Sequence, residues 1–330
     1  MGRPRKHAKH LPANMMFRHG RYYFVKSGKW RPLSKEYGAA LKAYADLVGK
    51  PVDVRTVHDA VWAYIEYAKT RKHKKPIAPS TIANYHHSAA NVCAVFGRMD
   101  LNDVDAGMVS RYVIEAGTVM ANRDKSLLSA AFTFARLHGF KGVDPTKGLQ
   151  VRNEEKPRDR YVEDAEMDRL VLASSPKLGT IARFIELTGM RQSDALRIRM
   201  ADIDEEGIHY QQGKTGKRLV VLWSPELTEV VEKAKVLWRR FGREWLFEGK
   251  PRGRYASHPI GAYTPSGLRS MWRKARAKAG LTDVRLHDLR GKAGSDSATE
   301  GEAQQLLGHA DVKMTRKHYR RKPERVNPLR

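Results

Sequence analysis

The sequence of 330 residues contains a single cysteine, Cys93, and no long apolar run. One cysteine excludes an intramolecular disulfide and argues against a cysteine-based zinc site. No stretch approaches the roughly 18 apolar residues of a membrane helix, and the basic residues 1–10 are not followed by the apolar segment of a signal peptide. These absences argue against export and membrane insertion, so we expect a cytoplasmic protein.

Ligand sets for metal ions are also missing from the sequence. Four histidines between residues 73 and 138 show no metal-ligand spacing. Asp194, Asp202 and Asp204 are too close together to hold a pair of magnesium ions, and arginines alternate with them, which is typical of a solvated face. We therefore expect neither a metal nor another cofactor.

Negative charge is scarce as well. Against 36 Asp and Glu the chain has 62 Lys and Arg, which gives a formal net charge of +26 and a pI near 10.2. This balance indicates a polyanionic partner, with a ribosome- or membrane-associated basic protein as the alternative. A hydrophobic fraction of 41% is typical of a globular protein, and 330 residues are enough for about two or three domains.

Residues 1–50 are strongly basic, with twelve Lys and Arg against two acidic residues, a net charge of 12 − 2 = +10. Within them, the segment G-R-P-R-K at 2–6 resembles an AT-hook core, in which an extended chain inserts arginines into a narrow minor groove. A generic basic tail explains the segment equally well. Arg3, Arg5 and Lys6 are thus candidate DNA contacts.

Three strands and one helix are predicted after this tail. Aromatic-rich stretches separated by His-Gly and Ser-Gly turns indicate strands over Met15–Arg18, Arg21–Lys26 and Lys29–Leu33. Apolar spacing then predicts a helix over Lys35–Val48. We interpret 1–50 as a small sheet with one packed helix that docks on DNA, with Arg21 and Lys29 among its contacts.

From 52 to 150 the pattern is helical and predicts a bundle. Thr56 and Ser80 are the expected N-caps of its first two helices, and two more are expected over Asp105–Glu115 and Ala121–His138. The loop that joins the first two helices is basic and supplies candidate phosphate contacts. These are Arg71, Lys72, Lys74 and Lys75.

A polar, aperiodic stretch at about 150–157 predicts a linker, and 157–330 predicts a mixed α+β domain. Its β part is a hairpin with strands over Gly207–Gln211 and Arg218–Leu222, whose tip carries Lys214 and Lys217. Helices are expected over Asp164–Ala173, Leu178–Leu187, Gln192–Arg197, Pro225–Arg239, Thr264–Ala279, Asp288–Ala298 and Glu302–Leu307. The expected fold class is multidomain and mostly α, with small β elements.

Candidate chemistry is concentrated in this last domain. Arg191 follows a turn that contains glycine and precedes a helix, a setting that suits a phosphate oxygen, and Asp194 can orient its guanidinium. His287 and Arg290 are three residues apart, so on a helix they project from one face and can hold one anion. Each pair alone is a weak signal.

The complete set is more specific. T-G-M-R-x-x-D at 188–194, a hairpin lysine, H-D-L-R at 287–290, L-G-H at 307–309 and the late Tyr319 together resemble the tyrosine recombinase, or phage integrase, family. The resemblance covers 157–330 and implies a catalytic domain there. For the preceding residues it implies an arm-type DNA-binding domain at 1–50 and a core-binding domain at 52–150, as in lambda-like integrases.

The resemblance also implies a metal-free reaction. Tyr319 would attack the scissile phosphate and form a 3′-phosphotyrosyl bond, which conserves the bond energy so that a 5′-hydroxyl can reverse the step. Arg191 and Arg290 would hold the two non-bridging oxygens. Asp194 would support Arg191 and take no part in the chemistry.

Proton transfer is implied for the remaining residues. His287 would act as the acid–base partner of the tyrosine, and His309 would hydrogen-bond the phosphate. By family position Lys214 would protonate the departing 5′-oxygen, and Lys217 remains the alternative because hairpin flexibility prevents a choice.

As a whole, the resemblance implies a site-specific integrase of a phage or mobile element in a bacterial cell. It would act on double-stranded DNA as a homotetramer, through a Holliday junction, at core sites and arm sites and with accessory DNA-bending proteins. A topoisomerase of type IB and a non-catalytic DNA-binding protein derived from integrases are the alternatives. A covalent protein–DNA adduct at a specific site distinguishes the three.

Two spacings depart from the commonest pattern of the family. The segment from Arg290 to His309 is about one helical turn shorter, and Gly291, Gly294 and Gly301 predict that it is a poor helix. The segment from His309 to Tyr319 is one residue longer. Either a loop absorbs these changes or the tyrosine is presented differently.

Overall fold

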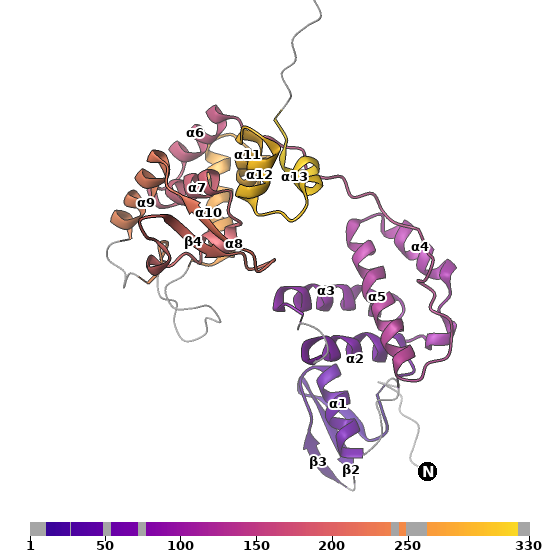
Figure 1. Ribbon diagram of the computed structural model, residues 1–330. Coiled ribbons are helices and arrows are strands. Elements are labelled where there is room, and N and C mark those ends of the chain that lie inside the picture. Colours follow the sequence, from indigo (N-terminus) through magenta and orange to yellow (C-terminus); the bar gives the residue numbers. More distant parts are fainter. Residues whose placement is uncertain are drawn as a thin grey trace, which may run out of the picture. The chain divides into compact units, whose positions relative to one another are not determined.

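The computed structural model describes residues 11–26, 28–48, 54–71, 77–238, 244–248 and 263–322. The chain forms two compact units, Met1–Glu155 and Lys156–Arg330, and their boundary falls inside the stretch predicted as a linker (Figure 1). Within the described ranges no helix is long and apolar enough to cross a membrane. Several predicted DNA contacts lie outside the described residues, namely Arg3, Arg5, Lys6, Lys72, Lys74 and Lys75.

The first unit begins with an antiparallel sheet in the order β1 (Met15–Arg18), β2 (Arg21–Lys26) and β3 (Lys29–Pro32). The turn between β1 and β2 has positive φ at both central residues, His19 and Gly20, as a two-residue hairpin loop requires. One face of the sheet packs on α1 (Tyr37–Val48), as the figure shows (Figure 1).

The other face of this sheet is aromatic and basic. The guanidinium of Arg18 lies 5.8 Å from the ring centre of Trp30, and Tyr23 meets the same ring edge to face. Arg21 pairs with Arg18 across the hairpin and lies on this face. Lys29 pairs with Lys26, so it is exposed on the opposite side of β3 from Trp30. Cations and π-faces side by side are the surface chemistry expected for a nucleic-acid contact.

A helical bundle completes the first unit. It contains α2 (Val57–Thr70), α3 (Pro79–Val95), α4 (Ala106–Ala116) and α5 (Val119–Leu137). Thr56 caps α2 in a capping box with Asp59, as predicted. The prediction that Ser80 caps α3 is wrong, because Pro79 occupies the first helical position, where its missing N–H costs nothing, and Ala78 precedes it. Arg71 lies at the end of α2.

The sheet and the bundle are in contact through α1 and α2. The buried Tyr37 hydroxyl donates to Asp59 at 2.6 Å. A Cβ on Gly38 would lie 2.5 Å from the Trp62 carbonyl oxygen, so the glycine permits this close approach. The division of the first unit at about residue 51 stays a prediction.

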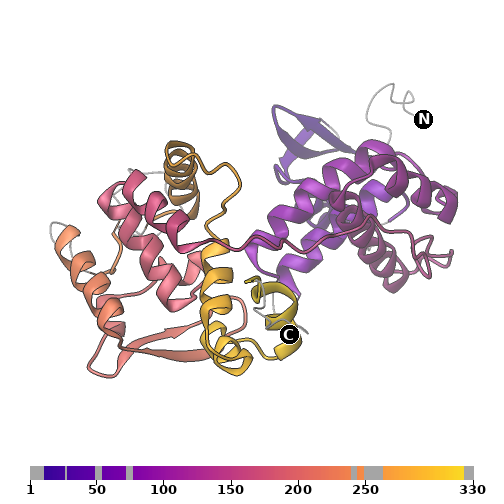
Figure 2. The same ribbon diagram turned by 90° about the horizontal axis from the view of Figure 1, so that it is seen from above.

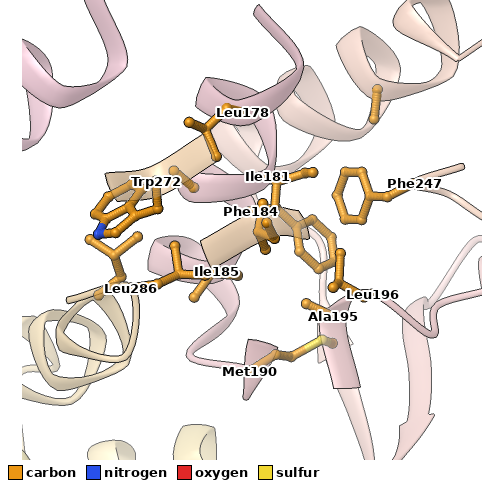
Figure 3. Packing of buried hydrophobic residues seen from close by; sticks show 14 of the residues in the cluster. Leu178, Ile181, Phe184, Ile185, Met190, Ala195, Leu196, Phe247, Trp272 and Leu286 are labelled. Carbon is orange, nitrogen blue, oxygen red and sulfur yellow. The ribbon is translucent and has the colours of Figure 1, made fainter. Parts of the chain in front are cut away.

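The second unit is built around α7 (Pro176–Thr188), whose apolar face carries Leu178, Ile181, Phe184 and Ile185 (Figure 3). The other helices are α6 (Asp164–Ala173), α8 (Gln192–Ala195), α9 (Pro225–Leu237), α10 (Pro265–Lys278), α11 (Asp288–Asp296), α12 (Glu300–Leu307) and α13 (Val312–Tyr319). A single-turn 3₁₀ helix, Met200–Asp202, lies between α8 and the hairpin, and another, Leu101–Asp103, lies between α3 and α4 of the first unit. The hairpin consists of β4 (Gly207–Gln211) and β5 (Arg218–Leu222), as predicted.

The last three helices correct the expectation of a poor helix after Arg290. Helix α11 continues through Gly291 and Gly294. Since these residues have no Cβ, other segments can approach the helix backbone closely and pack on it. A Cβ on Gly294 would lie 2.8 Å from Leu307 Cδ1 and 3.2 Å from Tyr319 Cβ. Helix α13, which was not predicted, therefore places Tyr319 against α11, and Figure 2 shows the three helices together in yellow.

Candidate active site

The C-terminal end of α13 meets the N-terminal end of α11. Nε2 of His287, which directly precedes α11, lies 3.2 Å from the hydroxyl oxygen of Tyr319, the last residue of α13. This distance is that of a hydrogen bond. Desolvation by the surrounding protein lowers the pKa of His287, and the cations Arg290 and Arg321 lower it further. The imidazole is therefore neutral at neutral pH and able to accept a proton.

Arg290 lies beneath this pair and is fully buried. Its Nη2 donates to the Leu307 carbonyl oxygen at 2.7 Å, and its Nη1 donates to the Gly189 carbonyl oxygen. Its guanidinium carbon lies 5.4 Å from the Tyr319 ring centre. The left-handed Gly189, which ends α7, thus positions the arginine from one side and the end of α12 positions it from the other.

His309 is fixed in one tautomer. Its Nε2 lies 3.1 Å from Nη2 of Arg290, and a guanidinium can only donate, so Nε2 accepts. The proton is therefore on Nδ1, which donates to the buried Thr315 hydroxyl at 2.8 Å. Desolvation, followed by the charges of Arg290 and Arg191, lowers the pKa of His309 to about 4. His309 is neutral in the absence of DNA.

Arg191 approaches the same place from the start of α8. Its Nη1 lies 3.8 Å from Oδ2 of the buried Asp194, and its charge lowers the pKa values of Arg290 and His309. Two arginines and two histidines are thus concentrated around the tyrosine, and Asp194 is the carboxylate beside Arg191. Such an arrangement favours an anion in their midst.

The β4–β5 hairpin is joined to the site at its base. The Gly213 N–H donates to Asp194 at 3.2 Å, and the buried Gln212 amide donates to the Leu307 carbonyl oxygen at 2.9 Å. That carbonyl also accepts from Arg290. Lys214 is exposed in the turn that follows, whereas the charge of Lys217 is near enough to lower the pKa of His309.

The structure thus brings together Arg191, Asp194, His287, Arg290, His309 and Tyr319, and it places Lys214 on the adjoining hairpin. Two supporting residues were missed. Thr315 fixes the His309 ring, and Gln212 ties the hairpin to the end of α12. Thr315 lies within the T-R-K-H-Y segment, but no sequence pattern indicated that either side chain points inward.

A basic groove adjoins the site. It has a volume of about 570 Å³ and is lined by Gln192 and His287 together with arginines of α10 and of the following loop. The arginines are Arg269, Arg273, Arg276 and Arg285. The described part of the chain has no group of three or more His, Cys, Asp or Glu side chains arranged to hold a metal ion.

Comparison with known proteins agrees with this geometry. The sequence model of the phage integrase family matches residues 160–325, which are 166 of the 330 residues. The chain belongs to the phage integrase family. It is a tyrosine-type site-specific recombinase, and Arg191, His287, Arg290, His309 and Tyr319 all lie within the matched range.

The similarity extends over nearly the whole chain. The integrase of Escherichia phage HK022 is 23% identical over an aligned length of 354. The alignment covers 96% of this chain and 96% of the relative. A lambda integrase dimer bound to a COC′ core site has a TM-score of 0.68 at 21% identity and covers 99% of both chains. A lambda integrase tetramer bound to a Holliday junction has a TM-score of 0.64 at 21% identity, over 92% of this chain and 97% of that one. The chain shares the mostly α, multidomain fold of these structures.

Proposed function

We propose that this integrase cleaves and rejoins DNA strands at specific sites through a 3′-phosphotyrosyl intermediate, with Tyr319 as the nucleophile. The observation that carries the proposal is the 3.2 Å approach of His287 Nε2 to the Tyr319 hydroxyl, directly above the buried Arg290. A phenol needs a base to become a strong nucleophile, and a neutral imidazole at hydrogen-bond distance is a suitable one.

In the cleavage step the Tyr319 oxygen attacks the scissile phosphorus while its proton passes to His287. A bond forms between the phosphorus and the Tyr319 oxygen, and the bond between the phosphorus and the bridging 5′-oxygen breaks. Lys214 donates the proton that makes the leaving group a 5′-hydroxyl. The reverse sequence, with a 5′-hydroxyl from another strand, rejoins the DNA without an external energy source.

Arg191 and Arg290 stabilise the negative charge of the phosphorane. The buried Nε of Arg290 and the buried Nη1 of Arg191 have no hydrogen-bond acceptor in the described part of the chain. A buried donor without an acceptor costs about 1–3 kcal/mol, and the two non-bridging oxygens of a phosphate would satisfy both. Their distribution on two elements suits two oxygens of one tetrahedral group.

His309 becomes a donor to the phosphate when DNA binds. In the free protein its Nε2 accepts from Arg290, and its pKa of about 4 keeps it neutral. The negative charge of the bound phosphodiester opposes the two arginines that lower the pKa of His309, and its oxygens offer Arg290 a better acceptor. His309 then protonates and donates through Nε2.

DNA contacts extend beyond the scissile phosphate. The arginines of the α10 groove continue the positive surface from His287. In the N-terminal sheet, Arg21 lies on the aromatic, basic face, and Lys29 is exposed beside the turn between β2 and β3. We assign residues 1–50 to arm-type sites and 52–150 to core sites. A homotetramer on a Holliday junction is supported by the lambda integrase tetramer that has this fold. Accessory bending proteins and a phage or mobile-element substrate in a bacterial cell complete the proposal.

The test is a nicked suicide duplex that carries the attachment site. The wild-type chain should form a covalent protein–DNA adduct, and Tyr319→Phe should form none while it still binds the duplex. An adduct that persists in Tyr319→Phe rules out this nucleophile. Relaxation of any supercoiled plasmid without site preference would favour the topoisomerase alternative, and specific binding without an adduct would favour a DNA-binding protein.

A further inference from the structure

We infer that Arg321 is a positioning residue for the nucleophile, and that it acts through Asp288, a carboxylate shared with Arg158 of the segment that enters the second unit. The inference rests on the proposed role of Tyr319. It assigns a function to three charged side chains that the reaction itself does not use.

Asp288 is the centre of this arrangement. It is 1% exposed and directly follows His287, at the start of α11. One of its oxygens accepts from Nη1 of Arg321 at 2.8 Å, and both accept from Nε of Arg158 at 3.0 Å. The Arg285 N–H donates to it at 2.8 Å. A buried carboxylate with this many donors holds its partners in fixed positions.

Arg321 follows the nucleophile by two residues and is nearly buried, with a side-chain exposure of 6%. Besides Asp288, it donates to the carbonyl oxygens of His318 at 2.9 Å and of Arg160 at 3.1 Å. Its guanidinium carbon lies 6.0 Å from the Tyr319 ring centre. The residue therefore ties the carbonyl just before the tyrosine to the start of α11, where His287 lies.

Space for this guanidinium comes from Gly291. A Cβ at that position would lie 2.9 Å from Nη1 of Arg321 and 3.0 Å from its Cζ. The arginine end is not free to swing away, since it donates to three acceptors at once. A glycine in the middle of a helix is unfavourable, and here it admits the positioning arginine.

The backbone after the tyrosine is fixed as well. The Ser295 hydroxyl donates to the Tyr319 carbonyl oxygen and accepts from the Arg321 N–H, both at 2.8 Å. Residues of α11 in the same chain therefore contact both parts of Tyr319. Ser295 bonds its main chain, and Arg290 lies near its ring. In this protein the hydroxyl of the tyrosine faces the phosphate site of the same protomer.

Arg158 adds a connection to the first residues of the second unit, which begins at Lys156. It contacts Asp288 through Nε and Nη2 and donates to the Asp283 carbonyl oxygen at 2.8 Å. Since Arg158 and Arg321 share one carboxylate, a movement of this entering segment alters the anchor of the nucleophile. Arg158 and Arg321 should thus be energetically coupled.

The test separates placement of the tyrosine from activation of the phosphate. Arg321→Ala should slow adduct formation in a single turnover by about 100-fold, the effect of a misplacement of about 1 Å, with DNA affinity within about threefold of the wild type. In a Tyr319→Phe background, hydrogen peroxide replaces the phenol as nucleophile and still needs the arginines. In this background, the peroxide cleavage rate of Arg321→Ala should be within about threefold of the rate of Tyr319→Phe alone.

Arg316→Ala is the matched control. It removes an equal charge from α13, where Arg316 bonds Glu300 at the surface with a side-chain exposure of 71%, and it should leave both rates unchanged. An unchanged adduct rate in Arg321→Ala would overturn the inference. So would an equal fall of the peroxide reaction, because Arg321 would then act on the phosphate. Absence of any adduct from the wild type would instead overturn the proposed function, and this inference with it.

Gly291→Ala reaches the same contact without altering charge and guards against misfolding of Arg321→Ala. The helix propensity of alanine offsets part of the cost of displacing the guanidinium, so the chain should remain folded, as its circular dichroism would show, while adduct formation slows by about 10-fold or more. The double variant Arg158→Ala/Arg321→Ala should be slowed by less than the product of the single effects. Multiplicative effects would show that the two arginines act independently and would overturn the sharing of Asp288.

Discussion

Nε2 of His287 and the hydroxyl oxygen of Tyr319 lie 3.2 Å apart although 32 positions separate the two residues. One stands at the beginning of α11 and the other at the end of α13, so three consecutive helices must fold back on one another to bring them together. The fold of a single chain therefore places the base at hydrogen-bond distance from the nucleophile.

Replacement of His287 tests this arrangement. His287→Ala should lower the rate of adduct formation by about 10²- to 10⁴-fold, the usual contribution of a general base, with little change in DNA affinity. The lowered pKa also predicts that the ring stays neutral, and the enzyme active, as the pH falls to the ordinary histidine value. The rate constant of adduct formation at subsaturating DNA reports the pKa values of the free enzyme. If this rate constant falls as the pH is lowered to about 7, the prediction is contradicted.

Arg191 should matter for the chemical step more than for binding. Arg191→Ala is expected to lower adduct formation by about 10²- to 10³-fold, the cost of one lost donor to a developing oxyanion, or roughly 3 kcal/mol. Arg169→Ala on the exposed face of α6 removes the same charge far from the tyrosine in sequence and serves as control. Equal losses in both variants would indicate a general electrostatic effect.

Much of this site could be predicted from the sequence because the reacting side chains have strict chemical requirements. Arg191 beside a Gly-containing turn and the His287/Arg290 pair on one helical face were readable from spacing alone. The hairpin strands matched the structure in both bounds because alternation and turn residues agreed. Most helices differed only at their ends.

Close packing between segments was not readable. Gly291 and Gly294 suggested a poor helix, since glycine is a weak helix former and the sequence does not show that Arg321 and Tyr319 approach α11. Helix α13 is short and has few apolar residues, so periodicity gave no signal. The buried Asp288 looked like one more charged residue within a motif.

Gly294 provides a stability test of this packing. Gly294→Ala gains about 1 kcal/mol of helix propensity but forces a Cβ within 2.8 Å of Leu307 and 3.2 Å of Tyr319. We expect a net loss of about 1–3 kcal/mol in the free energy of urea unfolding. The control is Gly301→Ala in α12, where the nearest atom would be 3.9 Å away and stability should rise or stay equal. A stabilised Gly294→Ala would contradict the close packing.

The lowered pKa of His309 predicts how the free energy of unfolding depends on pH. Its pKa is about 4 in the folded protein and near 6.5 when unfolded, so between these values the unfolded chain binds the extra proton. The contribution is complete above pH 6.5 and is lost as the pH falls towards 4. It should be roughly 2 kcal/mol, because a shift of one unit is worth about 1.4 kcal/mol and the ring is partly exposed.

The measurement is the unfolding free energy of the DNA-free protein at several pH values. His309→Gln should flatten the profile between pH 4 and 6.5 relative to the wild type. Parallel profiles for wild type and His309→Gln would show that the ring is not held neutral by its surroundings.

The general acid can be identified with a modified leaving group. Lys214 is exposed in the hairpin turn, and Lys217 lies close enough to influence His309, so position alone favours neither. A substrate with sulfur in place of the bridging 5′-oxygen leaves as a thiolate and needs no proton. The variant that lacks the true acid should therefore be slow on normal DNA and recover on the sulfur substrate.

We expect Lys214→Ala to be slowed by about 10²- to 10⁴-fold on normal DNA and to regain most of the wild-type rate with the sulfur leaving group. Lys217→Ala should lose less on normal DNA and show no selective recovery, since its role would be limited to charge near His309. The opposite result exchanges the two assignments. Equal recovery of both variants would mean that either lysine can protonate the 5′-oxygen.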